Sequence, residues 1–269
     1  MKLFGIIGKP LNHTRSPKIF NAIFKKRNLA CRYLPFQVEK EHLKNLILCM
    51  KLIDVEGLNV TSPYKESVIP FLDGLDVTAK ESGAVNTIVR NKNRFIGFNT
   101  DGIGFLEALL EKKGFAPKGK NIVIVGAGGA AKGIAANLAK KGAAHIAILN
   151  RTPARAKKVV SFLKKKFPKT KWQALNLTQK GRRDLFAKAD LLIHATSASL
   201  NLPLEYLPKT ALVCDIVYKP LQTKLLKQAK HLKLSTLDGL CLLVYQAKWN
   251  LKLWTGIDVD PAQIRKICR

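Results

Sequence analysis

The chain has 269 residues, 47% of them hydrophobic, and a formal net charge of +29 from 47 Lys and Arg against 18 Asp and Glu. That length fits two compact domains. The sequence has no apolar run near the ~18 residues that cross a bilayer and no secretory pattern, so we expect a cytoplasmic protein with no membrane anchor. Its five cysteines are scattered, so we expect neither a disulfide framework nor a metal site.

Strand-like and helix-like stretches alternate along the chain, which predicts an α/β fold with mostly parallel strands. Near the start, Ser16 and Pro17 indicate a helix, with Ser16 as the N-cap and Pro17 as the first helical residue. Asn91-Lys92-Asn93 predicts a hairpin turn. In this part we expect strands over 3–7, 33–38, 57–60, 85–89 and 94–98, and helices near 39–50 and over 100–113.

The second part of the chain begins after Gly114, which can end the preceding helix. Its first strand is the apolar, β-branched run at 122–125. Further buried strands are expected over 145–149, 191–194, 211–216 and 233–237, with helices over 130–141, 153–167 and 239–254.

A glycine-rich loop, Gly126-Ala127-Gly128-Gly129-Ala130-Ala131, lies between the first strand and the first helix of the second part. It fits the pattern Gly-x-Gly-x-x-Gly/Ala. In that context the glycines allow a tight turn and close approach of a pyrophosphate, which the helix N-terminus then holds. The loop predicts a dinucleotide site.

The end of the next strand indicates which dinucleotide binds. An NAD site usually has Asp or Glu there for the ribose 2′-hydroxyl, whereas this chain has Asn150, Arg151 and Thr152, with Arg155 one turn further on. Guanidinium groups bind a 2′-phosphate, which a carboxylate would repel. The cofactor predicted is therefore NADP.

Three polar clusters follow predicted strands of the first part, where open α/β sheets place ligands. They are residues 12–17, residues 59–65, and the pair 83–87 and 99–102. Ser62-Pro63 looks like a helix start, which would put Lys65 in the first turn. There the helix dipole opposes a cation and would prepare the amine for proton transfer. A solvated surface lysine, and for Asp101 a simple helix cap, are the alternatives.

Twelve Lys and Arg and no acidic residue occur between Arg151 and Arg183. Such runs are most often solvated faces. A nucleic-acid partner is the sharper interpretation, but no helix-turn-helix, zinc finger or stacking aromatic cluster accompanies the charge, so we do not expect one.

Taken in order, these motifs resemble the shikimate dehydrogenase family over essentially the whole chain. The resemblance rests on Asn59-Val60-Thr61-x-Pro63-x-Lys65, Gly83-Ala84-Val85-Asn86-Thr87, Asn99-Thr100-Asp101-Gly102, the glycine loop, Asn150-Arg151-Thr152, Asp215-Ile216-Val217-Tyr218, and Asp238-Gly239-Leu240 with Gln246.

The resemblance implies NADP-dependent interconversion of 3-dehydroshikimate and shikimate, with Lys65 and Asp101 as the catalytic pair. It implies substrate contacts from Thr14, Ser16, Thr61, Asn86, Asp101, Tyr218 and Gln246. The cofactor would meet Gly126, Ala127, Gly128, Gly129, Ala130, Asn150, Arg151, Thr152 and Arg155, with Ile216 and Gly239 at the nicotinamide.

The family's fold is an N-terminal α/β substrate domain with a doubly wound Rossmann-type NADP domain. It implies a discontinuous first domain, 1–101 with 238–269, around an NADP domain at 102–237, in a monomer or homodimer. Thr14, His194, Ser199 and Cys241 depart from the family's usual Ser, Asn, Gly and Gly. The methyl of Thr14 leaves open a quinate/shikimate dehydrogenase of broader specificity, and a basic binding protein that keeps only the fold is the other alternative.

Overall fold

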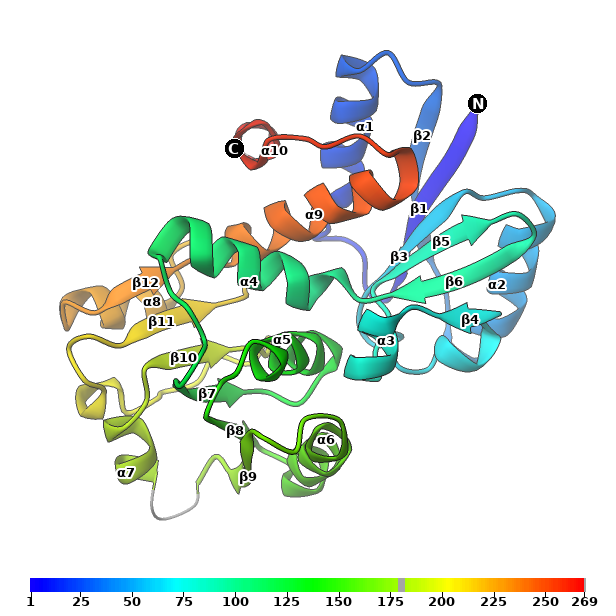
Figure 1. The fold of residues 1–269 in the computed structure, drawn as a ribbon. Coiled ribbons are helices and arrows are strands. Elements are labelled where there is room, and N and C mark those ends of the chain that lie inside the picture. Colours follow the sequence, from blue (N-terminus) through cyan, green and yellow to red (C-terminus); the bar gives the residue numbers. More distant parts are fainter. Residues whose placement is uncertain (179–181, 269) are drawn as a thin grey trace. The chain divides into compact units, whose positions relative to one another are not determined.

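The computed structural model describes residues 1–178 and 182–268, and these form two compact units. The first unit comprises residues 1–104 and 244–269, and the second comprises residues 105–243. The boundaries between the units fall inside two helices, α4 (Thr100–Lys113) and α9 (Gly239–Thr255), which Figure 1 labels. The predicted alternation of strands and helices is confirmed in both units.

The first unit is built on a six-stranded sheet with the order β2-β1-β3-β5-β6-β4. β1 pairs in parallel with both β2 and β3, whereas β5 runs antiparallel to β3 and to β6. β4 pairs in parallel with β6, so this sheet is mixed but only β5 runs against the other strands, because the predicted hairpin joins it to β6. The expectation of mostly parallel strands is therefore confirmed here as well. The remaining elements of the unit are β1 (Lys2–Gly8), α1 (Ser16–Lys26), β2 (Cys31–Gln37), η1 (Lys40–His42), α2 (Leu43–Leu52), β3 (Gly57–Val60), η2 (Ile69–Phe71), β4 (Gly74–Leu75), α3 (Val77–Ser82), β5 (Thr87–Asn91), β6 (Arg94–Phe98) and α10 (Pro261–Ile267).

Two hydrophobic layers cover the faces of this sheet, because successive strand residues point to opposite sides. On one face Ile7 and Leu58 belong to a cluster that includes Ile47 of α2. On the other face Phe4 contacts the ring of Trp254 from α9, at a centroid distance of 5.2 Å. The part of α9 that belongs to the first unit is therefore part of its core.

The second unit has a fully parallel six-stranded sheet with the order β12-β11-β10-β7-β8-β9, which can be followed in Figure 1. The chain starts at the centre with β7, builds outward through β8 and β9, and then crosses to β10 on the other side. This order is that of a doubly wound dinucleotide-binding fold, so the predicted fold class is confirmed. The elements are β7 (Asn121–Val125), α5 (Gly129–Lys140), β8 (His145–Asn150), α6 (Pro153–Lys166), β9 (Lys171–Asn176), α7 (Arg182–Ala187), β10 (Leu191–His194), η3 (Leu204–Tyr206), β11 (Leu212–Asp215), α8 (Lys224–His231) and β12 (Ser235–Leu237).

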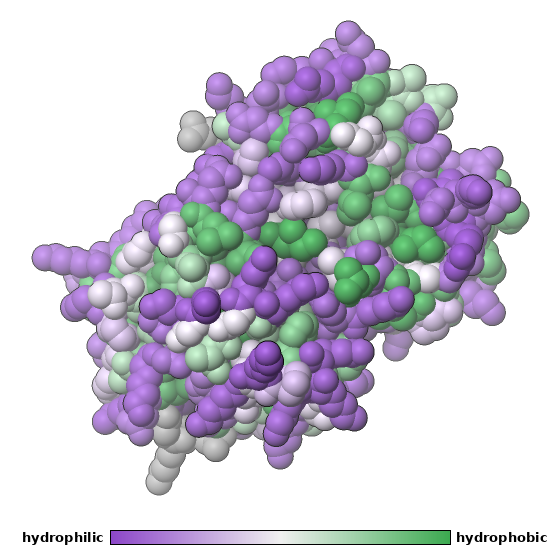
Figure 2. Space-filling model, in the orientation of Figure 1, coloured by the Kyte–Doolittle hydropathy of each residue, from purple (hydrophilic) through white to green (hydrophobic). Residues whose placement is uncertain are grey.

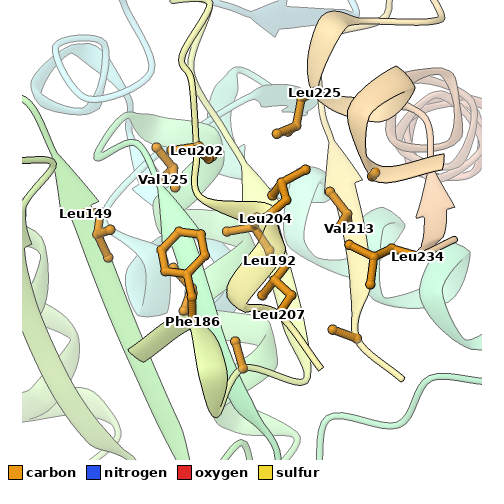
Figure 3. Packing of buried hydrophobic residues seen from close by; sticks show 14 of the residues in the cluster. Val125, Leu149, Phe186, Leu192, Leu202, Leu204, Leu207, Val213, Leu225 and Leu234 are labelled. Carbon is orange, nitrogen blue, oxygen red and sulfur yellow. The ribbon is translucent and has the colours of Figure 1, made fainter. Parts of the chain in front are cut away.

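The core on one face of this sheet is formed by side chains from its central strands, α7 and α8. Val125, Leu192 and Val213 point from neighbouring strands toward Phe186 of α7 and Leu225 of α8 (Figure 3). All of these side chains are at least 95% buried. Because such a core fixes the strand ends against one another, it also fixes the points at which the loops after β7, β10 and β11 begin.

Several elements were not expected from the sequence, and the edge strand β9 is the most instructive. Its segment lies inside the basic run, and only some of its side chains are partly buried. An edge strand is covered on fewer sides than a central one, so its sequence carries a weaker apolar signal. Within the described residues, no helix is both long and apolar enough to span a membrane.

Candidate active site and cofactor site

The polar clusters of the first unit meet along one edge of its sheet. The loop with Thr14 and Ser16 follows β1, and the segment with Thr61 and Lys65 follows β3, whose end is aligned with that of β1 (Ile7 opposite Val60). The antiparallel pairing places the start of β5 and the end of β6 at the same edge, since Asn59 is opposite Thr87 and Thr87 is opposite Phe98. Residues far apart in the sequence are thus brought together.

Lys65 and Asp101, the predicted catalytic pair, are in direct contact. Lys65 Nζ lies 2.5 Å from Asp101 Oδ2, and their side chains are only 14% and 6% exposed. The other carboxylate oxygen, Oδ1, accepts a hydrogen bond of 2.8 Å from Asn86 Nδ2. The backbone carbonyl of Lys65 accepts the Val85 N–H at 2.7 Å. Both the ammonium and the carboxylate are therefore held in place by groups of the protein.

The predicted helix at Ser62-Pro63 does not form, so that prediction is wrong. Residues 62–68 form turns, and only the short η2 follows. The carbonyl of Lys65, which a helix would use for its own ladder, instead accepts the N–H of Val85. Pro70 also lacks the N–H that would bond the carbonyl of Glu66. Lys65 is consequently not in the first turn of a helix of its own, and the group that contacts its ammonium is the Asp101 carboxylate in the first turn of α4.

A buried hydrogen-bonded network continues from Asp101 to α9. Asn86 Nδ2 lies 2.9 Å from Thr100 Oγ1, and the hydroxyls of Thr87 and Thr100 lie 2.7 and 2.8 Å from Asn250 Oδ1. Asn250 Nδ2 in turn donates to Gln246 Oε1 at 2.9 Å. Thus Gln246, a predicted substrate contact, is connected through Asn250, Thr100 and Asn86 to the Asp101 carboxylate.

Asn250, which is fully buried, was missed by the sequence analysis. The signal available was a second amide, four residues after Gln246 and on the same face of a largely apolar helix. Its partners, Thr87 and Thr100, are separated from it by 163 and 150 positions, and no local pattern identifies them.

A second chain of contacts connects Ser16 to Asn86 through two other residues that were missed. The Tyr33 hydroxyl donates to Asn59 Oδ1 at 2.7 Å, and Asn59 Nδ2 donates to the Asn86 carbonyl at 3.2 Å. Burial raises the pKa of the Tyr33 phenol well above its ordinary value, and a hydrogen bond with the Ser16 side chain partly opposes that rise. Tyr33 is therefore a neutral donor that fixes Asn59.

The prediction that Ser16 is the N-cap of α1 is wrong. The helix has Arg15 as its N-cap, without a side-chain cap, and Ser16 is the first helical residue. The Ser16 N–H instead contacts the Thr14 hydroxyl at 3.3 Å. Thr14 and Ser16 therefore lie side by side after β1, and the half-buried Thr61 lies after β3 on the adjacent strand.

This arrangement combines a buried ammonium–carboxylate pair with several amides and hydroxyls. A positioned ammonium can stabilise negative charge that develops on a substrate oxygen and can deliver a proton. The amides and hydroxyls can hydrogen-bond a ligand rich in hydroxyl and carboxylate groups. The chemistry defined by these residues is acid–base chemistry on a small polar molecule.

In the second unit the glycine loop occupies the point where the strand order reverses, between β7 and β10. Gly126 has a φ of +125°, and a Cβ there would lie 2.3 Å from the carbonyl oxygen of Ala195, so glycine is required twice over. Gly128 is the N-cap of α5, and no atom lies within 4 Å of the position that a Cβ would take. The first turn of α5 carries no acidic residue and no side-chain cap. These features fit a pyrophosphate at the N-terminus of α5.

The residues at the end of β8 fit a 2′-phosphate. Asn150 ends the strand and donates from Nδ2 to the carbonyl of Thr152 at 3.0 Å, while Arg151, Thr152 and Arg155 are exposed. The first turn of α6 has no acidic residue. Hydrophilic side chains dominate the visible surface over α6 (Figure 2). Because the first turn of α6 carries no carboxylate, it would not repel a phosphate.

Ile216 and Gly239, the predicted nicotinamide contacts, are adjacent in the second unit. A Cβ on Gly239 would lie 2.5 Å from the carbonyl carbon and oxygen of Ile216. The segments that follow β11 and β12 therefore touch, and only glycine permits this approach. Tyr218 is half-buried two residues beyond Ile216.

The sheet order and the glycine loop define a dinucleotide-binding protein, and comparisons with known proteins define its family. Residues 6–88 match the shikimate dehydrogenase substrate-binding domain, and residues 108–207 match shikimate/quinate 5-dehydrogenase. A shikimate dehydrogenase (NADP(+)) from Pyrococcus furiosus is 41% identical over 99% of this chain and 94% of that protein.

Solved structures agree with this assignment. The shikimate 5-dehydrogenase from Thermus thermophilus in complex with NADP(H) and shikimate is 31% identical, with a TM-score of 0.86 over 100% of this chain and 98% of that one. The quinate dehydrogenase from Corynebacterium glutamicum in complex with NAD is 29% identical, with a TM-score of 0.90 over 99% and 98%. The chain belongs to the shikimate dehydrogenase family.

Proposed function

We propose that this protein is an NADP-dependent oxidoreductase that interconverts 3-dehydroshikimate and shikimate, in the pathway to chorismate and the aromatic amino acids. The observation that carries the proposal is the buried contact between Lys65 and Asp101, oriented by Asn86, in a chain of this family. An inactive binding protein of the same fold would have no need to keep an ammonium and a carboxylate in contact at low exposure.

In the reductive direction, the Lys65 ammonium stabilises the oxyanion that develops from the substrate ketone and delivers a proton to it. Asp101 accepts a hydrogen bond from Lys65 and one from Asn86, so its carboxylate keeps the ammonium aimed and orients the hydroxyl product. Bound NADPH supplies the hydride. The protein contributes position and charge.

The substrate contacts in this proposal come from residues at the strand ends of the first unit, from Gln246 of α9 and from Tyr218. Ser16 and Thr14 hold the substrate carboxylate, and the remaining contacts go to the carboxylate or the ring hydroxyls. The set is Thr14, Ser16, Thr61, Asn86, Asp101, Tyr218 and Gln246. Residues 1–101 with 238–269 form the substrate domain in this proposal.

The cofactor contacts belong to residues 102–237, with Gly239 just beyond them. The N–H groups around Gly126, Gly128 and Ala130 receive the pyrophosphate, and Arg151 and Arg155 bind the 2′-phosphate. Ala127, Gly129, Asn150 and Thr152 complete the adenosine side, and Ile216 and Gly239 lie against the nicotinamide. The same high positive charge attracts an anionic substrate and cofactor. We further propose a cytoplasmic monomer or homodimer.

A broader quinate/shikimate dehydrogenase is the second candidate, and Thr14 is the observation that favours it. Its hydroxyl accepts the Ser16 N–H, and its side chain carries an extra methyl group at the position where the proposal places the ring acid. Quinate carries one more hydroxyl than shikimate, so a change at this position alters the preference between the two.

Steady-state assays at alkaline pH with shikimate or quinate and with NADP+ or NAD+, followed at 340 nm, test both candidates. We expect reduction of NADP+ with shikimate, at a higher kcat/KM than with NAD+. A higher kcat/KM for quinate establishes the second candidate. No absorbance change with either acid, from protein that binds NADP+, refutes both. Nucleic-acid binding that persists at about 200 mM salt would then support a basic binding protein.

A further inference from the structure

His194 is a buried histidine at the end of β10, at the position where the family usually has Asn. Its ring bridges two segments of the second unit. Nδ1 lies 3.0 Å from Asp215 Oδ1, and Nε2 lies 3.0 Å from the carbonyl oxygen of Ala198. Both partners accept hydrogen bonds, so the imidazole N–H donates to whichever of them its tautomer faces.

One end of the bridge is firmly anchored. Asp215 ends β11, its Oδ1 also accepts the Val217 N–H at 3.0 Å, and its Oδ2 accepts the Thr223 hydroxyl at 2.7 Å. Thr223 caps α8 through the Leu226 N–H. Asp215 therefore joins β11, the segment leading to Ile216, and the start of α8.

The other end of the bridge holds a loop beside the glycine loop. Residues 195–199 follow β10, and the Ala195 N–H donates to the Val125 carbonyl at 2.7 Å. The Ala195 carbonyl is the group that a Cβ on Gly126 would strike. Ser197, Ala198 and Ser199 are exposed, so apolar burial does little to fix the far part of this loop.

We propose that His194 is a positioning residue for NADP binding, which fastens the 195–199 loop to the end of β11 in the arrangement that receives the cofactor. The ligand in this inference rests on the proposed function. An Asn side chain is too short to span both partners: its amide reaches the position of Nδ1 but not that of Nε2. The bond to Ala198 is therefore the contribution of histidine at this position.

Two amide substitutions separate the two contacts. His194→Asn keeps a donor for Asp215 and loses the bond to Ala198, whereas His194→Gln keeps a donor near the Nε2 position and loses the bond to Asp215. We expect His194→Asn to raise the Kd and KM for NADP+ about three- to tenfold, the loss typical of one hydrogen bond, with kcat at saturating NADP+ and the KM for shikimate within about twofold of wild type. We expect His194→Gln to bind NADP+ more tightly than His194→Asn.

Hydrogen exchange supplies a readout without cofactor. In the free protein, we expect faster amide exchange over residues 195–202 in His194→Asn and unchanged exchange in the β10 strand. The inference is overturned if His194→Asn keeps the NADP+ affinity and the loop exchange of the wild type. It is also overturned if His194→Asn binds NADP+ more tightly than His194→Gln. If the wild-type protein itself neither binds NADP+ nor oxidises shikimate, the proposed function fails instead, and the exchange data alone decide the role of His194 in the loop.

Discussion

Asn86 Nδ2 lies 2.8 Å from Asp101 Oδ1, so the residue just before β5 orients the carboxylate that contacts Lys65. The same amide group lies 2.9 Å from Thr100 Oγ1, and Asn86 Oδ1 accepts the Thr100 N–H at 2.8 Å. Asp101 and its neighbour in α4 are thereby fixed by one side chain, which explains how an ion pair at low exposure keeps a defined geometry.

Replacement of Lys65 by Ala is expected to lower kcat by about 10²–10⁴-fold, the range typical of a positioned acid–base group. Asp101→Asn should also lower kcat, because the ammonium loses its partner charge. Neither variant should change the Kd for NADP+, since the predicted cofactor contacts lie elsewhere in the chain. Steady-state kinetics and NADP+ titration check this, and a Lys65→Ala variant with near wild-type kcat would refute the catalytic role.

Replacement of Asn250 by Leu is expected to lower the free energy of unfolding by about 1–3 kcal/mol, because the buried Thr87 and Thr100 hydroxyls lose an acceptor. The KM for shikimate should rise, since Gln246 loses the donor that holds it. Chemical denaturation and kinetics measure the two effects.

Lys252→Leu on the same helix is the matched control, because Lys252 is half exposed and its bridge to Asp258 spans 3.7 Å. It should change stability by no more than about 0.5 kcal/mol. An Asn250→Leu protein as stable as this control would show that the network carries little energy.

Replacement of both Arg151 and Arg155 by Ala is expected to weaken NADP+ binding about 10–100-fold, because bonds from charged donors to the 2′-phosphate are lost. NAD+ lacks that phosphate, so its affinity should hardly change. Binding titrations with both dinucleotides test this. Lys165→Ala with Lys166→Ala, at the far end of α6, is the control for loss of charge alone. Equal weakening in both double variants would mean that general charge, not these arginines, attracts NADP+.

The pKa of His145 is lowered by burial and, to a smaller degree, by the charge of Lys171. Its Nε2 is buried and has no hydrogen-bond partner among the described residues. A lowered pKa means that the unfolded chain binds the proton more readily, so stability is lost as pH falls through the ordinary value of 6.5 toward the folded value.

Thermal unfolding between pH 7.5 and 5.0 should therefore show a smaller decrease in Tm for His145→Phe than for wild type. The control is His231→Phe, which replaces an exposed histidine at the end of α8 and should leave the decrease unchanged. A wild-type decrease in His145→Phe would show that other groups account for the acid sensitivity.

The sequence by itself determined the features whose signals are local. The glycine loop lies between a β-branched strand and a helix, so the local sequence identifies it. The lack of a carboxylate after Leu149 can be recognised as soon as the end of that strand is located. The alternating elements likewise indicated an α/β fold with mostly parallel strands, because each buried strand of a parallel sheet is a continuous apolar run.

Only the tertiary structure decided the local conformation at Lys65, the partners of Asn250 and the bridge formed by His194. The Lys65 carbonyl bonds to Val85, and this contact outweighs the local preference of Ser-Pro for a helix start. Asn250 contacts Thr87 across 163 positions of sequence, and His194 contacts Asp215 across 21. A buried polar group takes whichever partner packing brings near, because leaving it unpaired costs about 1–3 kcal/mol. The partner of a buried polar group is therefore set by the packing of the whole fold, and the residues beside it in the sequence do not indicate which partner it is.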